Sequence, residues 1–326
     1  MNSKTYKIMS VITMALVFGV LVTFAATGER SDADGGTTGA VDWSYDNNIL
    51  SIWGNGDMGN YGPGDAPWYA HQYDILSIEI YIGVTSIGDY TFYDCINASS
   101  VSIPDSVISI GEGAFYGCNS LGPVTIEGSV GTIGYRAFYG SAITNLEILG
   151  DVGTIGSEAF SYSGLTTLEI LGNIGSIGSE AFSYSGLTNL EIQKNVGTIG
   201  QWAFTYSDIT TLEIQGDVGT VEKWAFQNSA VTTLEIQGDV GTVEEWAFQD
   251  SGITTIEIQG NVGTIGADAF EYASYFTTLR IQGNVGTIGY GAFALTPIPT
   301  LYIQGNVGTI DGYAFYMCGN LESFVL

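Results

Sequence analysis

Carboxylate side chains recur at a fixed spacing through the middle of the chain. Six Glu residues follow one another every 22 residues, each within a Leu-Glu-Ile or Ile-Glu-Ile triplet: Glu147, Glu169, Glu191, Glu213, Glu235 and Glu257. Two unit charges roughly 5 Å apart in water repel by about 0.8 kcal/mol, so a stacked row is costly unless something offsets it. Two interpretations are open: a site for Ca²⁺ or a basic ligand, and a solvated acidic face screened by salt.

Three Trp residues share this spacing, each two residues before a Phe: Trp202, Trp224 and Trp246. Other repeats place Tyr, Gly, Arg, Glu or Asp there, so we expect the position to face water. Stacked about 5 Å apart, the rings would form a strip of the kind that binds protein side chains or sugars. Alternatively, they lie flat over the next turn and seal the coil. Four Tyr residues could extend the strip: Tyr162, Tyr184, Tyr206 and Tyr272.

The three Cys residues all lie three positions after a recurring Phe, where central repeats carry Ser. One interpretation is that each Cys packs as a small buried side chain. The other is a disulfide between Cys95 and Cys118, which occupy the same position in adjacent repeats, with Cα atoms about 5 Å apart. Three Cys without convergent His do not make a zinc site, and no cofactor is expected.

Catalysis needs unlike groups that converge at one point. This chain instead repeats like groups, with one His, seven Lys and Arg, and no Gly-rich phosphate loop. We therefore expect a binding or structural protein and not an enzyme.

A recurring Phe shows which elements must position these rows. It returns every 22 or 23 residues, at Phe92, Phe115, Phe138, Phe160, Phe182, Phe204, Phe226, Phe248, Phe270, Phe293 and Phe315. A fixed period in the twenties predicts a solenoid in which each repeat is one coil. Leu-Glu-Ile alternates like a half-buried strand, and stacking these strands predicts one parallel sheet. A row of Gln residues, from Gln193 to Gln304, is expected to hydrogen-bond along the stack.

The strings SVISIGEGAFYGCNSL (106–121) and GVTSIGDYTFYDC (83–95) resemble the BspA-like leucine-rich repeats of microbial surface proteins. The resemblance covers residues 75–326, about eleven coils, and residues 41–74 resemble the small β-rich cap that leads such arrays. It implies a leucine-rich-repeat solenoid with a single stacked parallel sheet. It also implies a secreted or cell-surface binding protein, often an adhesin, and offers no catalytic residues to carry over.

Charge and the N-terminus narrow the partners and the location. The chain has 34 Asp and Glu against 7 Lys and Arg, which excludes nucleic acid as a partner because that requires basic side chains. Lys4 and Lys7 precede an apolar run, so residues 1–26 are expected to be a signal peptide or an N-terminal anchor, followed by a linker over 27–40. The protein is then extracellular or on the cell surface, with membrane contact only through an uncleaved N-terminal segment.

Two functions remain in view. The first is an adhesin-type binding protein that recognises a protein or a glycan at the cell surface. The alternative is a structural scaffold of the cell envelope that assembles end to end. Leu321–Leu326 fills the strand position of a further coil without a cap, and an uncapped sheet edge invites pairing.

Overall fold

The computed structural model describes residues 34–325, and residues 35–325 lie in one compact unit. The expected signal peptide or anchor, residues 1–26, lies outside the described residues. So do residues 27–33 of the expected linker. The last part of that linker forms strand β1 (Asp34–Thr38). In the described part of the chain, no helix is long and apolar enough to cross a membrane.

A small mixed sheet opens the fold and covers the first coil. It has the order β1, β2 (Val41–Asp46), β3 (Ile49–Gly54), β5 (Ser77–Ile80) and β7 (Ser100–Ser102). β2 and β3 are antiparallel, and the Asn47-Asn48 turn between them has the positive φ angles that a tight hairpin needs. After the 3-10 helix η1 (Tyr69–His71) the chain enters the repeats. Trp68 is buried against Phe92, and its Nε1 donates to the Thr91 carbonyl at 2.9 Å.

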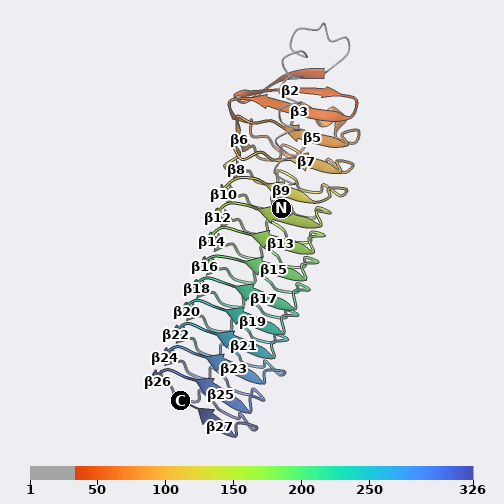
Figure 1. The fold of residues 1–326 in the computed structure, drawn as a ribbon. Helices are drawn as coiled ribbons and strands as arrows, with labels where there is room; N and C mark the ends of the chain where they lie inside the picture. Colours follow the sequence, from red (N-terminus) through yellow and green to blue (C-terminus); the bar gives the residue numbers. More distant parts are fainter. Residues whose placement is uncertain (1–33, 326) are drawn as a thin grey trace, which may run out of the picture. The chain divides into compact units, whose positions relative to one another are not determined.

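The predicted fold class is confirmed, with one correction: the coils contribute strands to two parallel sheets instead of one (Figure 1). The Leu-Glu-Ile segments and the strands at the same repeat position form a ten-stranded sheet: β9 (Val124–Ile126), β11 (Asn145–Ile148), β13 (Thr167–Ile170), β15 (Asn189–Ile192), β17 (Thr211–Ile214), β19 (Thr233–Ile236), β21 (Thr255–Ile258), β23 (Thr278–Ile281), β25 (Thr300–Ile303) and β27 (Ser323–Val325).

The second sheet has twelve strands, half of them with the sequence Val-Gly-Thr-Ile. They are β4 (Gly56–Asp57), β6 (Val84–Ile87), β8 (Ser109–Ile110), β10 (Val130–Ile133), β12 (Val152–Ile155), β14 (Ile174–Ile177), β16 (Val196–Ile199), β18 (Val218–Val221), β20 (Val240–Val243), β22 (Val262–Ile265), β24 (Val285–Ile288) and β26 (Val307–Ile310). Their Gly is required by close packing. A Cβ on Gly219 would lie 2.2 Å from the carbonyl oxygen of Gly197 in the preceding coil.

The core contains a ladder of Phe rings. It lies between the two sheets and the turn segments that follow the Val-Gly-Thr-Ile strands and carry the recurring Phe. Consecutive rings of the recurring Phe stack with centroids 4.8–5.4 Å apart. Each coil adds aliphatic side chains around its ring, and those of one coil are all buried: Leu190, Ile192, Val196, Ile199, Ala203 and Ile209. Stacking therefore buries a continuous apolar column that no single coil could form.

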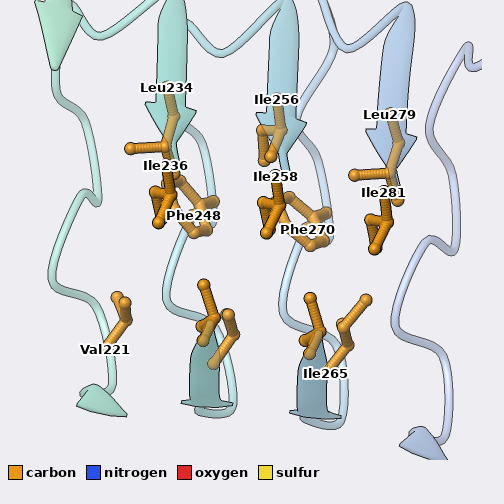
Figure 2. A pocket seen from close by; sticks show the side chains of 13 residues that line it. Val221, Leu234, Ile236, Phe248, Ile256, Ile258, Ile265, Phe270, Leu279 and Ile281 are labelled. Carbon is orange, nitrogen blue, oxygen red and sulfur yellow. The ribbon is translucent and has the colours of Figure 1, made fainter. Parts of the chain in front are cut away.

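One gap interrupts this column. An apolar cavity of about 20 Å³ lies between the sheets, and Val221, Val243 and Ile265 contribute to its lining (Figure 2). Most coils carry Ile at the position of Val221 and Val243. The cavity therefore coincides with the two coils that each lack one methyl group.

Two rows of polar side chains recur along the coils, and one of them ties adjacent coils together. At the turn after the Leu-Glu-Ile strand, each Asn or Asp Oδ1 accepts a hydrogen bond from the backbone N–H one coil on, at 2.7–3.3 Å from Asp151 to Asn284. The side-chain ladder along the stack is therefore formed by these Asn and Asp residues. In the Gln row, where it was expected, Gln193 instead donates a hydrogen bond to Glu169. Inside the coil, the buried Ser at the Cys position donates to the carbonyl of its own Phe, as Ser163 does to Phe160 at 2.7 Å.

Candidate aromatic binding surface

The Trp position has a left-handed backbone. The φ angles are 53° at Trp202, 57° at Trp224 and 58° at Trp246, and Gly113 and Gly291 at the same position have φ 54° and 61°. A bulky side chain in this region is strained. The same positive φ occurs at this position in the other coils: Tyr90, Arg136, Glu158, Glu180, Asp268 and Tyr313. The turn dictates the conformation, and Gly is the relaxed choice there, so three consecutive Trp residues must be stabilised by their contacts.

Those contacts are ring on ring. Trp202 and Trp224 stack with centroids 5.2 Å apart and planes 2° apart, and Trp224 and Trp246 follow at 5.4 Å and 14°. All three side chains are half-buried. Because each ring covers its neighbour's face, the stack presents mainly ring edges to solvent. The rings are thus neither fully exposed nor sealed over, and both interpretations, a binding strip and a cover over the coil, stay open.

A row of six Tyr rings lies on the same turns. Their centroids are 4.8–5.5 Å apart, through Tyr93, Tyr116, Tyr139, Tyr162, Tyr184 and Tyr206. The last three are about half exposed, at 54, 46 and 49 %. The two rows share one coil, which carries both Trp202 and Tyr206. We call the Trp row and the Tyr row together the aromatic surface.

Sequence reasoning found only part of the Tyr row. Tyr93, Tyr116 and Tyr139 directly follow their Phe, whereas the later members lie two residues after it. The row changes sequence position at Tyr162 without a break in the stack, at a pair whose planes are tilted by 50°. The signal was an aromatic residue at either position in six consecutive repeats. Tyr272, also expected to contribute, is 48 % exposed but is separated from the row by coils with Asn228 and Asp250.

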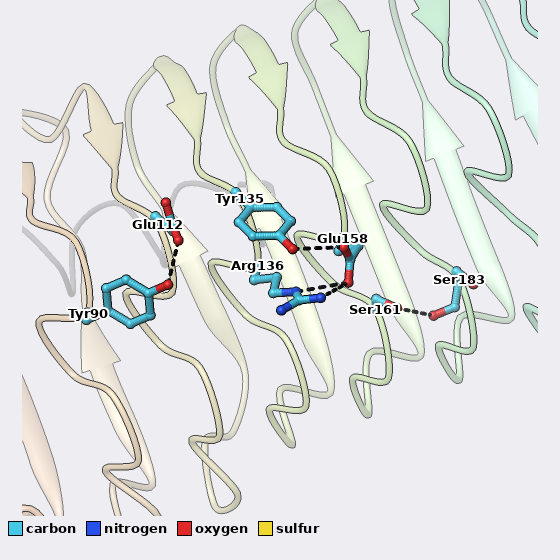
Figure 3. A network of polar contacts seen from close by, with 7 residues as sticks. All are labelled: Tyr90, Glu112, Tyr135, Arg136, Glu158, Ser161 and Ser183. Atoms are coloured by element: carbon cyan, nitrogen blue, oxygen red, sulfur yellow. Dashed lines mark hydrogen bonds and ion pairs between the residues drawn. The ribbon is translucent and has the colours of Figure 1, made fainter. Parts of the chain in front are cut away.

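Polar side chains continue the Trp position toward the N-terminus (Figure 3). The Tyr90 hydroxyl donates to Glu112, and Arg136 Nη2 pairs with Glu158 at 2.8 Å. The hydrogen bond to Glu112 is the largest cause, and burial the second, of a rise in the pKa of Tyr90 to about 12. Beneath them, Ser161 Oγ donates to the carbonyl of Ser183 at 3.0 Å.

The predicted Glu row forms in register on the ten-stranded sheet. Glu147 pairs with Glu169, Glu169 with Glu191, and the pairing continues to Glu257. Arg280 ends the row, with its Nε 3.8 Å from Glu257. Within residues 34–325, no group of three or more His, Cys, Asp or Glu side chains could hold a metal ion. Ca²⁺ binding therefore stays a prediction, and it would have to use two neighbouring carboxylates and water.

The Cys position is buried at Cys95 and Cys118, as the sequence predicts. The thiols are free in this structure, and Cys118 Sγ lies 3.2 Å from the carbonyl of Phe92. Burial raises the pKa of Cys95 to about 12 and that of Cys118 well above its usual value. These thiols are poor nucleophiles, and the disulfide between them stays a prediction.

Stacked coils of 22 or 23 residues around a Phe ladder define a solenoid of the leucine-rich-repeat type. A family model described as the BspA type leucine-rich repeat region matches residues 85–210 and 197–322, with six copies. These matches span more than half of the chain, which therefore belongs to the BspA-type leucine-rich repeat family.

Solved structures with similar repeats come from bacteria. A leucine-rich repeat protein from Bacteroides ovatus is 16 % identical, with 91 % of this chain and 94 % of that chain covered and a TM-score of 0.40. One from Eubacterium ventriosum is 19 % identical, with 82 % and 96 % covered and a TM-score of 0.35. A leucine-rich cell surface protein from Faecalibacterium prausnitzii is 18 % identical, with 91 % and 89 % covered and a TM-score of 0.33. The comparison with curated proteins gave no match.

Proposed function

We propose that the protein is an adhesin-type binding protein, secreted or on the cell surface, and that its aromatic surface binds a protein partner. The observation that carries this is the Trp stack. Trp202, Trp224 and Trp246 occupy a strained position that Gly fills without strain, and they remain partly exposed. Trp and Tyr dominate protein interfaces because they supply large contact areas with polar tips.

The ring geometry favours protein over glycan as the ligand. A sugar ring stacks on an aromatic face, and the faces inside both rows are covered by neighbouring rings, as between Tyr162 and Tyr184 at 4.9 Å. What remains outward are ring edges and Tyr hydroxyl groups, which suit interdigitating protein side chains. A glycan would be restricted to the ends of the rows.

The test is binding of the full chain to a panel of matrix proteins and to a glycan array. The decisive variant is Trp202→Gly, Trp224→Gly, Trp246→Gly, because Gly suits the left-handed backbone and preserves the fold. The matched control is Glu191→Gln, Glu213→Gln, Glu235→Gln on the ten-stranded sheet. Protein binding that is lost only in the Trp variant supports the proposal. Binding that survives in the Trp variant contradicts it, and binding to glycans alone changes the ligand class.

End-to-end assembly is the second candidate, and one observation favours it. In the described residues, Ile310 of the last coil is 46 % exposed, whereas Ile288 at the same position one coil earlier is fully buried. A second copy that stacks on this coil would restore that burial. Sedimentation over a range of concentrations tests it. Self-association that Val325→Pro abolishes supports assembly, and a monomer at every concentration contradicts it.

A further inference from the structure

Three of the four basic side chains in the described chain share one arrangement. Each lies over an aromatic ring and pairs with a carboxylate. Arg136 is 4.8 Å from the Tyr135 centroid and 2.8 Å from Glu158. Lys223 lies 5.5 Å from the Trp246 centroid and 2.5 Å from Glu245. Arg280 lies 4.9 Å from the Tyr302 centroid and 3.8 Å from Glu257. Cation, ring and carboxylate stabilise one another in this arrangement.

The N-terminal end of the Trp stack has two of these three components. Glu180 occupies the Trp position one coil before Trp202, and its backbone N–H donates to the carbonyl of Gln201 at 2.9 Å. One face of Trp202 is covered by Trp224, and among residues 34–325 no second ring stacks on Trp202. Within the same residues, Glu180 has no ion pair. At the other end of the stack, Lys223 already lies over Trp246.

We propose that the corner formed by Glu180 and Trp202 receives an arginine side chain from the protein partner. The inference rests on the proposed function and specifies the chemistry of that ligand. A guanidinium group fits better than an ammonium group because it is planar, stacks on an indole and pairs with a carboxylate through two N–H groups.

Charge complementarity favours a basic partner. Residues 34–326 contain 32 Asp and Glu against four basic residues, Arg136, Lys194, Lys223 and Arg280. Three of the four are engaged in the arrangement described above. The surrounding field therefore attracts cationic segments and accelerates their association.

The test uses the full chain and three synthetic peptides, Gly-Ser-X-Ser-Gly with Arg, Lys or citrulline at X. Citrulline has the shape of Arg without its charge. Binding is followed by the NMR signals of the Trp indole N–H groups. We expect the Arg peptide to shift the Trp202 signal most and to bind about fivefold more tightly than the citrulline peptide, the ratio expected for an exposed cation–π contact.

Two variants separate a local effect from a general charge effect. Glu180→Gln should weaken the Arg peptide about fivefold, while Glu127→Gln, the same charge change at an exposed position outside the Glu row and the aromatic surface, should leave its affinity unchanged. The inference is wrong if the Arg peptide does not bind, if it binds no better than the citrulline peptide, or if the two variants behave alike. Loss of matrix-protein binding in the triple Trp variant would still support the proposed function in each of those cases.

Discussion

Trp202 and Trp224 lie with ring planes 2° apart and centroids 5.2 Å apart, and both project from backbone positions with positive φ. The stack thus combines favourable ring contacts with unfavourable backbone conformations. The balance between the two can be measured by substitutions that remove the ring and vary the strain.

We expect Trp224→Gly to retain the fold and Trp224→Val to be less stable than the Gly variant by about 1–3 kcal/mol. A β-branched side chain is poorly tolerated at a φ of 57°, which Gly adopts freely. Urea unfolding followed by circular dichroism gives both free energies. Equal stability of the two variants would show that the turn relaxes and that the Trp residues carry no strain.

Filling the cavity should stabilise the protein. Val221→Ile and Val243→Ile each restore a methyl group next to a void of about 20 Å³ and should add about 0.5–1.5 kcal/mol. Val196→Ile is the control, because no residue of its coil lines the cavity, and it should give no comparable gain. Thermal unfolding of the single and double variants provides the comparison. A lower melting temperature for Val243→Ile would mean that the space is not available to the added methyl.

Two tyrosines should titrate late. Burial, followed by the hydrogen bond to Glu79, raises the pKa of Tyr81 to about 12, and the bond to Glu112 does the same for Tyr90. Because the folded pKa is above the unfolded value, this stabilisation is complete below about pH 10 and is lost as the pH rises toward 12. Tyrosinate absorbance should show two groups that ionise last, and Tyr90→Phe should remove one of them. Titration of all tyrosines together near pH 10 would contradict this.

Free thiols can be counted to decide the state of Cys95 and Cys118. We expect both to resist alkylation in the folded protein, because burial raises their pKa values. After unfolding without reductant, mass spectrometry should find three alkylated Cys if no bridge exists. Alkylation at Cys318 alone would establish the Cys95–Cys118 disulfide instead.

The Glu row should respond to divalent cations. Repulsion between neighbours such as Glu191 and Glu213 predicts that millimolar Ca²⁺ raises the melting temperature. Glu191→Gln combined with Glu213→Gln should itself stabilise the protein at low salt, by about 1 kcal/mol, and should reduce the gain from Ca²⁺. NaCl at matched ionic strength separates binding from screening. An identical response to both salts would assign the row to the solvated acidic face.

The sequence predicted the stacking because a constant period places equal positions above one another. The burial of Phe204 and the pairing of Glu191 with Glu213 follow directly from that rule. The second sheet was missed because Val-Gly-Thr-Ile is short and contains Gly, which usually indicates a turn. Only the close approach of Gly219 to Gly197 explains why a strand needs Gly there.

The candidate site was predictable in position and less so in geometry. Spacing alone placed Trp202, Trp224 and Trp246 in one stack, but their left-handed backbone depends on how the turn closes between two sheets. The continuity of the Tyr row could not be derived from spacing either, because the side chains of Tyr139 and Tyr162 meet from different sequence positions. Such matches depend on side-chain direction, which a repeat period does not specify.

The near identity of neighbouring coils has an evolutionary consequence. Each coil contacts mainly the coils before and after it, and residues 212–233 begin and end where the adjoining repeats do. Loss of that segment by unequal recombination would join Thr211 to Leu234 and leave both sheets in register, with Trp202 now next to Trp246. The length of the aromatic surface is therefore inherited as a copy number, and a lineage can lengthen or shorten it in single genetic events without redesigning the core.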